Sequence, residues 1–108
     1  MKIYFAGSIR GGRDFSHIYP LIINRLKKYG EVLTEHVAND DYLLLEESHL
    51  TDYEIHERDI DWLMNSDIVI AEVSNPSLGV GYELGRAIEN NKRIFCLFMN
   101  TNSKKYQP

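Results

Sequence analysis

The segment PSLGVGYELG, at residues 76–85, places one carboxylate, Glu83, among several glycines where a helix is expected to begin. A carboxylate beside an open, glycine-rich backbone can attack the electron-poor anomeric carbon of a sugar. The first turn of a helix also favours an acidic side chain for a simpler reason, because the positive end of the helix dipole lies there. The segment alone leaves both interpretations open.

The segment HERDIDWL supplies a second candidate carboxylate, Asp59, with Glu57 and Asp61 beside it. Two carboxylates near a sugar suit the cleavage of a glycosidic bond, because one can attack the anomeric centre while the other helps the base to leave. A solvated helix face is the alternative interpretation of this acidic cluster.

A further glycine-rich segment, GSIRGGR at residues 7–13, carries two guanidinium groups, Arg10 and Arg13. Backbone amides of glycines can approach an anion closely, and arginine holds phosphate through parallel hydrogen bonds. The segment lacks the lysine and spacing of a P-loop and does not match the dinucleotide-binding fingerprint, so a simple tight turn is the alternative. Ser77 and Gly79 in the other glycine-rich segment favour the anion site.

Alternating strand and helix patterns must position these groups. Strands are expected at residues 2–6, 31–34, 67–73 and 93–98, and helices at 15–29, from a capping box at 51–54 to about 65, and at 82–90. This order predicts a parallel sheet with helices on both sides. Ligands bind beyond the carboxyl ends of such strands, which selects the loops at 7–13 and 74–81.

Several other features of the chain limit its function. The last two strand segments are almost continuously apolar, which predicts strands covered on both faces. The chain has 108 residues, enough for one domain, and its net charge of −4 gives no general footprint for a nucleic acid polymer. No apolar run approaches the length of a membrane span. The one cysteine, Cys96, has no partner for an internal disulfide, which indicates a reducing, cytoplasmic setting.

Five segments in order, YFAGSIRGG, LTEHV, HERDIDWL, AEVSNPSLGVGYELGRAI and NKRIFCLF, together resemble the 2′-deoxynucleoside 5′-phosphate N-hydrolases, relatives of the nucleoside 2-deoxyribosyltransferases. The resemblance implies a Rossmann-like, flavodoxin-like α/β fold with three layers, and a homodimer. It implies an enzyme that splits a deoxynucleoside 5′-monophosphate into a free base and 2-deoxyribose 5-phosphate. It implies no cofactor and no metal.

The resemblance also assigns roles to residues. Glu83 matches the nucleophile that forms a covalent deoxyribosyl intermediate, and Asp59 matches the acid that assists the leaving base. Tyr4 matches the tyrosine that orients the nucleophile. We expect the glycine turn to admit the substrate and the helix start to keep Glu83 ionised. The positions that match the sugar-phosphate site are Gly7, Ser8, Ile9, Arg10, Gly11, Gly12, Arg13, Ser77 and Gly79.

The chain departs from the resemblance at its C-terminal end, TNSKKYQP. Family members normally continue with a further helix, strand and helix, and a serine there reaches the phosphate site of the neighbouring subunit. We therefore expect residues 1–108 to form a single domain that lacks these elements. A deoxyribosyltransferase and a non-catalytic nucleotide-binding module are the alternatives, although SIRGGR with SLG favours a phosphorylated substrate over a bare nucleoside.

A few side chains carry weaker expectations. Tyr19, His36 and His56 could approach the base or sugar, but such residues more often serve packing or the surface. Trp62 is expected in the core or a dimer interface, and Cys96 is expected to be buried. The LLLEE segment at residues 43–47 could form a lid or a wall over the base, and residues 35–50 as a whole are expected to be a long loop.

Overall fold

A computed structural model describes residues 1–9, 14–39 and 49–100 of the chain. Within these residues, four parallel strands form one sheet in the order β2-β1-β3-β4. The strands are β1 (Lys2–Ala6), β2 (Glu31–Val32), β3 (Ile68–Glu72) and β4 (Arg93–Leu97). In the centre of the sheet, Ile3 of β1 pairs with Ile68 of β3. The expected parallel α/β sheet is confirmed.

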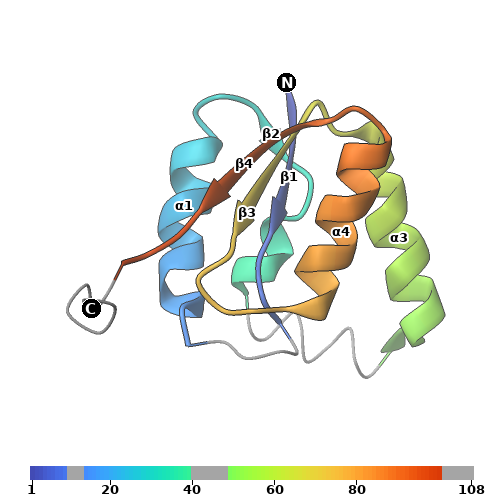
Figure 1. Cartoon of the computed structure of the whole chain (residues 1–108), viewed down its shortest axis with the longest axis horizontal. Helices are drawn as coiled ribbons and strands as arrows, with labels where there is room; N and C mark the ends of the chain where they lie inside the picture. The colour runs from blue at the N-terminus through green and yellow to red at the C-terminus, as the bar shows by residue number, and fades with distance from the viewer. Residues whose placement is uncertain (10–13, 40–48, 101–108) are drawn as a thin grey trace, which may run out of the picture.

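Helices cover both faces of this sheet (Figure 1). One face carries η1 (Ser16–Ile18), α1 (Tyr19–Leu26) and η2 (Glu35–Ala38), and the other carries α3 (Asp52–Asn65) and α4 (Leu78–Glu89). The arrangement therefore has three layers, as the Rossmann-like expectation required.

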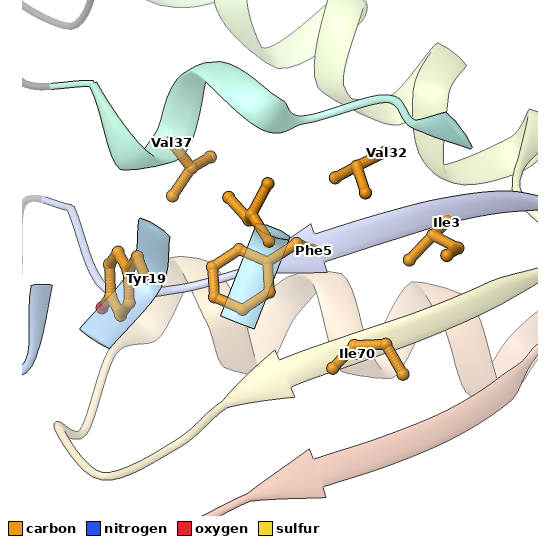
Figure 2. Close-up of a cluster of buried hydrophobic side chains, with 7 residues drawn as sticks. Ile3, Phe5, Tyr19, Val32, Val37 and Ile70 are labelled. Carbon is orange, nitrogen blue, oxygen red and sulfur yellow. The ribbon is translucent and has the colours of Figure 1, made fainter. Parts of the chain in front are cut away.

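Strand β1 separates two hydrophobic cores because its side chains alternate between the faces of the sheet. Ile3 and Phe5 pack with Tyr19 of α1, and Figure 2 shows this cluster. The rings of Phe5 and Tyr19 meet edge to face, with centroids 5.3 Å apart. Tyr4 and Ala6 point to the opposite face and pack with residues of α3 and α4. The alternation thus sends Tyr4 toward the helix that carries Glu83.

The start of α3 confirms the expected capping box. Glu54 N donates to Thr51 Oγ1 at 3.1 Å, and Thr51 N donates to Glu54 Oε1 at 3.0 Å. These two bonds satisfy backbone donors that a helix leaves free at its first turn. The helix ends at Asn65, where the sequence predicted it.

The helix expected over residues 15–29 is shorter in the structure and is divided into η1 and α1. Pro20 lies in the first turn of α1, where its missing N–H costs nothing, and therefore does not kink the helix. Gly30 does not end the helix directly, because α1 already ends at Leu26. A Cβ atom at Gly30 would lie 2.1 Å from Met1 O, so close packing against the start of β1 requires this glycine.

Strand β2 is also shorter than expected and ends at Val32. Beyond it, the side chain of Thr34 takes over the role of a strand backbone. Thr34 Oγ1 accepts a hydrogen bond from Phe5 N at 2.8 Å and donates one to Phe5 O at 2.7 Å. The chain then turns into η2, where the sequence predicted a loop.

Strand β4 corrects the expectation of a strand covered on both faces. Phe95 is 59% exposed and Leu97 is 38% exposed. In the described sheet β4 is the edge strand, and α1 packs over β1 and β2 instead. Ile94, on the opposite face, packs against the cluster under α4. Cys96 is exposed as well, so the expectation of a buried cysteine is wrong.

Helix α4 begins at Leu78, earlier than the residue 82 that the sequence predicted. Gly79 and Gly81 are therefore helical residues, and the expected glycine turn before Glu83 is wrong. Ser77 is the N-cap, and its Oγ accepts a hydrogen bond from Val80 N at 3.2 Å. A strong cap offsets the low helix propensity of the glycines that follow.

None of the helices in the described ranges is long and apolar enough to cross a membrane.

Candidate active site

A cavity of about 590 Å³ lies at the carboxyl end of β1. Its walls come from the end of β1, from residues 34–37, from α3 and from the start of α4. Gly7 and Ile9 line it from the segment after β1, and Ser77 and Gly79 line it from the segment after β3. The two loops selected by the strand order therefore border the same cavity.

Tyr4 and Glu83 meet inside this cavity although they are 79 positions apart in the chain. The Tyr4 hydroxyl donates a hydrogen bond to Glu83 Oε2. Tyr4 is 2% exposed, so its ring is held rigidly by the core while its hydroxyl reaches the cavity. This contact fixes the orientation of the Glu83 carboxyl group.

Burial raises the pKa of Glu83 to about 7. Desolvation disfavours a charged carboxylate, and this is the largest cause of the shift. The expectation that a helix start keeps Glu83 ionised is wrong, because Glu83 lies beyond the first turn of α4 and the dipole effect fades within that turn. A carboxyl with a pKa near neutrality is poised between its acid and its nucleophilic form.

The N-terminus of α4 forms the part of the cavity suited to an anion. The backbone N–H groups of Leu78 and Gly79 have no intrahelical acceptor, as at the start of any helix. Gly79 adds no side chain over them, and the nearest atom to a Cβ built there is Ser77 Oγ, at 3.8 Å. The Ser77 hydroxyl accepts from Val80 N and keeps its own proton to donate. These donors suit a phosphate.

Some of the expected site residues in the segment after β1 line the cavity, and others are buried in the core. A Cβ atom at Gly7 would lie 2.7 Å from Tyr19 Cζ, so this glycine also allows close packing. Ser8 is buried, and its Oγ has no hydrogen-bond partner among the described residues. Tyr19 is a core residue whose hydroxyl donates to Ser8 O at 3.1 Å. Arg10, Gly11, Gly12 and Arg13 lie outside the described residues.

Asp59 lines the cavity from α3, together with His56, and His36 lines it from η2. The side chain of Asp59 is 29% exposed, so it does not belong to a fully solvated face. The ring of His56 lies 5.5 Å from that of Tyr82, which joins α3 to α4 beside the cavity. Both histidines therefore line the cavity, where a base or sugar could contact them as the sequence analysis considered.

Sequence reasoning missed Arg58, which also lines the cavity. Its Nη2 lies 2.9 Å from Asp59 Oδ1 and 3.3 Å from His36 Nε2. Its guanidinium carbon lies 4.6 Å from the centroid of the Trp62 ring. Spacing gave one signal, since Arg58 and Trp62 are four residues apart and share a helix face. Trp62 is partly buried and packs against the core between the sheet and helices α3 and α4. This agrees with the first of its two expected positions, the core or a dimer interface.

A family model described as "Nucleoside 2-deoxyribosyltransferase" matches residues 3–107. The chain belongs to this family. The resemblance inferred from the sequence segments is therefore confirmed.

Curated relatives of this deoxyribosyltransferase family member have related names. The chain is 56% identical over 108 residues to "Putative 2′-deoxynucleoside 5′-phosphate N-hydrolase 1" of Nematostella vectensis, with 96% of this chain and 71% of that protein covered. It is 55% identical over 104 residues to "5-hydroxymethyl-dUMP N-hydrolase" of Danio rerio, with 96% of this chain and 73% of that protein covered. It is 56% identical over 97 residues to the Homo sapiens protein of the same name, with 89% of this chain and 56% of that protein covered.

Within this family member, the three expected catalytic side chains, Tyr4, Asp59 and Glu83, all border one cavity. Their roles remain predictions. No group of three or more histidine, cysteine or acidic side chains in the described part of the chain is arranged to hold a metal ion. The possible lid at residues 43–47 lies outside the described residues.

Proposed function

We propose that this deoxyribosyltransferase family member hydrolyses the N-glycosidic bond of 2′-deoxynucleoside 5′-monophosphates. The products are a free base and 2-deoxyribose 5-phosphate. The observation that carries the proposal is the Tyr4–Glu83 hydrogen bond inside a cavity that also presents Asp59. The names of the curated relatives, which describe N-hydrolases of such nucleotides, support it.

The reaction proceeds in two displacements at the sugar. In the first, a Glu83 oxygen attacks C1′, the C1′–N bond breaks, and its electron pair leaves with the base, which takes a proton from the Asp59 carboxyl group. In the second, the Asp59 carboxylate takes a proton from a water molecule, whose oxygen attacks C1′ and breaks the new ester bond. This regenerates the Glu83 carboxylate and the protonated Asp59. Tyr4 holds Glu83 in line for both steps. A 2′-deoxy sugar eases both steps because no electron-withdrawing hydroxyl stands beside C1′.

The 5′-phosphate lies at the N-terminus of α4 in this proposal. Ser77 and Gly79 supply donors there, and the expected partners from the first loop are Gly7, Ser8, Ile9, Arg10, Gly11, Gly12 and Arg13. Glu83 lies about 1.4 turns beyond the helix start at Leu78, roughly 7.5 Å along the axis, a distance that suits a phosphate and an anomeric carbon of the same nucleotide. The base then extends toward Asp59 and α3.

We propose 5-hydroxymethyl-dUMP as the first substrate to test, because curated relatives bear this substrate in their names. The protein is incubated with 5-hydroxymethyl-dUMP, dGMP, deoxyguanosine and GMP, and released base is measured by liquid chromatography. Release from the deoxynucleoside monophosphates but not from deoxyguanosine or GMP is the expected result. No release from any of them would reject hydrolysis and leave a nucleotide-binding module.

A deoxyribosyltransferase is the second candidate, because the matching family model has that description. This activity needs an unphosphorylated nucleoside and an acceptor base. Deoxyguanosine is incubated with free adenine, and deoxyadenosine is measured. Its formation in preference to hydrolysis of the monophosphates would favour the transferase.

The covalent step has its own test. A short reaction of the wild type, stopped by denaturation, is analysed by intact mass. We expect a deoxyribose-phosphate adduct in the wild type and none in Glu83→Gln. An equally active Glu83→Gln variant would remove Glu83 from the mechanism.

We also propose a homodimer in the cytoplasm. The exposed apolar side chains Phe95 and Phe98, on and after β4, support association with a second copy. The free thiol of Cys96 suits a reducing compartment. Sedimentation velocity measures the assembly, and a monomer at micromolar concentration would contradict the dimer.

A further inference from the structure

Arg58 contacts Asp59 through two donors on the same oxygen. Arg58 Nε lies 3.2 Å and Nη2 lies 2.9 Å from Asp59 Oδ1. The side chains of the two residues are 21% and 29% exposed, so most of this pair is shielded from water. A hydrogen-bonded ion pair in such surroundings is stronger than one on an open surface.

Helix geometry does not produce this contact by itself. Consecutive residues of a helix point in different directions, and side chains meet at spacings of three or four. Arg58 must therefore bend along the helix to reach its neighbour. A long, flexible side chain holds such a conformation only when other contacts compensate for its lost rotamer freedom.

Two further contacts hold the guanidinium group in this position. It lies over the ring of Trp62, one turn along α3, with its central carbon 4.6 Å from the ring centroid. Its Nη2 also lies 3.3 Å from Nε2 of His36, a residue of η2 that lines the same cavity. The rings of His36 and Trp62 in turn lie 5.1 Å apart. Arg58 is thus held by a residue of its own helix and by a residue of η2.

In the proposed function, Asp59 is the group that faces the leaving base, and the contact acts on this group. A two-donor contact restricts the rotation of a carboxyl group. The guanidinium charge by itself favours an ionised carboxyl and so opposes an acid that must carry a proton. Positioning is therefore the way in which Arg58 can help the base to leave. Without Arg58, the Asp59 carboxyl would rotate more freely beside the cavity. The efficiency of a group that acts on a reacting atom depends strongly on such positioning.

We propose that Arg58 is a positioning residue, which acts on the base-leaving step by holding the Asp59 carboxyl group in place. The inference rests on the proposed function, because it needs a leaving base. A purely structural role for Arg58, as a cover for Trp62, is the competing explanation. The two explanations differ in whether the effect of Arg58 depends on Asp59.

A double-mutant cycle separates them. Arg58→Met, Asp59→Asn and the double variant are compared with the wild type for kcat and KM on 5-hydroxymethyl-dUMP and dGMP. We expect Arg58→Met to lower kcat about 10- to 100-fold, the size of one charge-assisted contact, with little change in KM. We expect the double variant to be no slower than Asp59→Asn, because Arg58 has nothing left to position.

The leaving base provides a second signature. The decrease in kcat caused by Asp59→Asn should be larger for poor leaving bases than for good ones, because protonation matters most when the base is a poor leaving group. Arg58→Met should show the same order of losses. Loss of packing around Trp62 would instead slow all bases equally and lower the thermal unfolding midpoint.

Two variants serve as controls. Arg25→Met removes the same charge from the exposed surface of α1, outside the cavity, and should keep the wild-type rate. Arg58→Lys keeps the positive charge but not the two-donor geometry of the guanidinium group, and its kcat should lie between those of the wild type and Arg58→Met. If Arg58→Met does not fold, the cycle is completed with Arg58→Lys.

The outcomes are distinguishable. A wild type that releases no base from any nucleotide overturns the proposed function and this inference together. An active wild type with independent, multiplicative losses in the double variant overturns the role of Arg58 alone. An Arg58→Met variant with the wild-type kcat, or with a change confined to KM, also overturns it.

Discussion

At the residue scale, Glu83 combines burial with a hydrogen bond from Tyr4. Burial raises its pKa to about 7, and only the ionised carboxylate can attack C1′. We therefore expect kcat/KM to rise about tenfold per pH unit below this pKa and to level off above it. A pH profile with the monophosphate measures this. A rate that stays constant from acidic to neutral pH would contradict Glu83 as the ionising nucleophile.

The same pKa shift affects the stability of the fold. The folded protein retains a proton on Glu83 between pH 4.5, the ordinary pKa of a glutamate, and its raised pKa of about 7, whereas the unfolded chain releases it. The free energy of unfolding should therefore fall as pH rises through this window, by a total on the order of 3 kcal/mol. Glu83→Gln removes this dependence and should be the more stable protein above neutral pH.

Urea unfolding of wild type and Glu83→Gln at the two ends of the window measures the difference. Glu89→Gln, at an exposed position near the end of α4, is the matched control and should follow the wild type. An identical pH dependence in wild type and Glu83→Gln would show that another group causes it.

At the element scale, the start of α4 has two tasks that one substitution can separate. Ser77 caps the helix, and Ser77→Ala should cost about 1 kcal/mol of stability. If its hydroxyl also donates to the 5′-phosphate, the variant should lose activity toward the monophosphate more than toward the bare deoxynucleoside. Kinetics on both substrates test this, and equal losses would restrict Ser77 to its capping role.

A partly buried hydrogen-bond network lies at the end of β3, just before this helix start. Glu72 accepts hydrogen bonds from Ser74 N at 2.9 Å and Ser74 Oγ at 2.8 Å, and Met99 N donates to Ser74 Oγ at 2.8 Å. These bonds tie the end of β3 to the segment after β4. The loop that leads to Ser77 is therefore anchored at its base by the sheet itself.

At the scale of the whole molecule, the described sheet leaves its β4 side open. Cys96 lies on this strand and is exposed, so a thiol-reactive dye should label the native protein rapidly without denaturant. The labelling rate is measured across a range of protein concentrations. Labelling that slows as concentration rises would indicate that a second copy covers β4, and labelling only after unfolding would contradict the exposure.

The sequence by itself determined the order of the elements and several of their details. The alternation of apolar strands and amphipathic helices predicted the parallel sheet, and the capping box predicted the start of α3. These features depend on local chemistry, because periodicity and capping act within a few residues. Motif resemblance then identified the family and drew attention to Glu83, Asp59 and Tyr4.

Only the tertiary structure decided what surrounds these side chains. Local pattern placed Glu83 in a helix start, whereas Ser77 caps α4 earlier and the core buries the carboxyl in the second turn. The apolar run of β4 predicted burial, but coverage of a strand depends on which helices pack over it. Arg58, which contacts Asp59, also contacts His36 from an element far away in the chain. Burial, charge state and side-chain direction come from packing between segments far apart in the chain, and local sequence does not encode them.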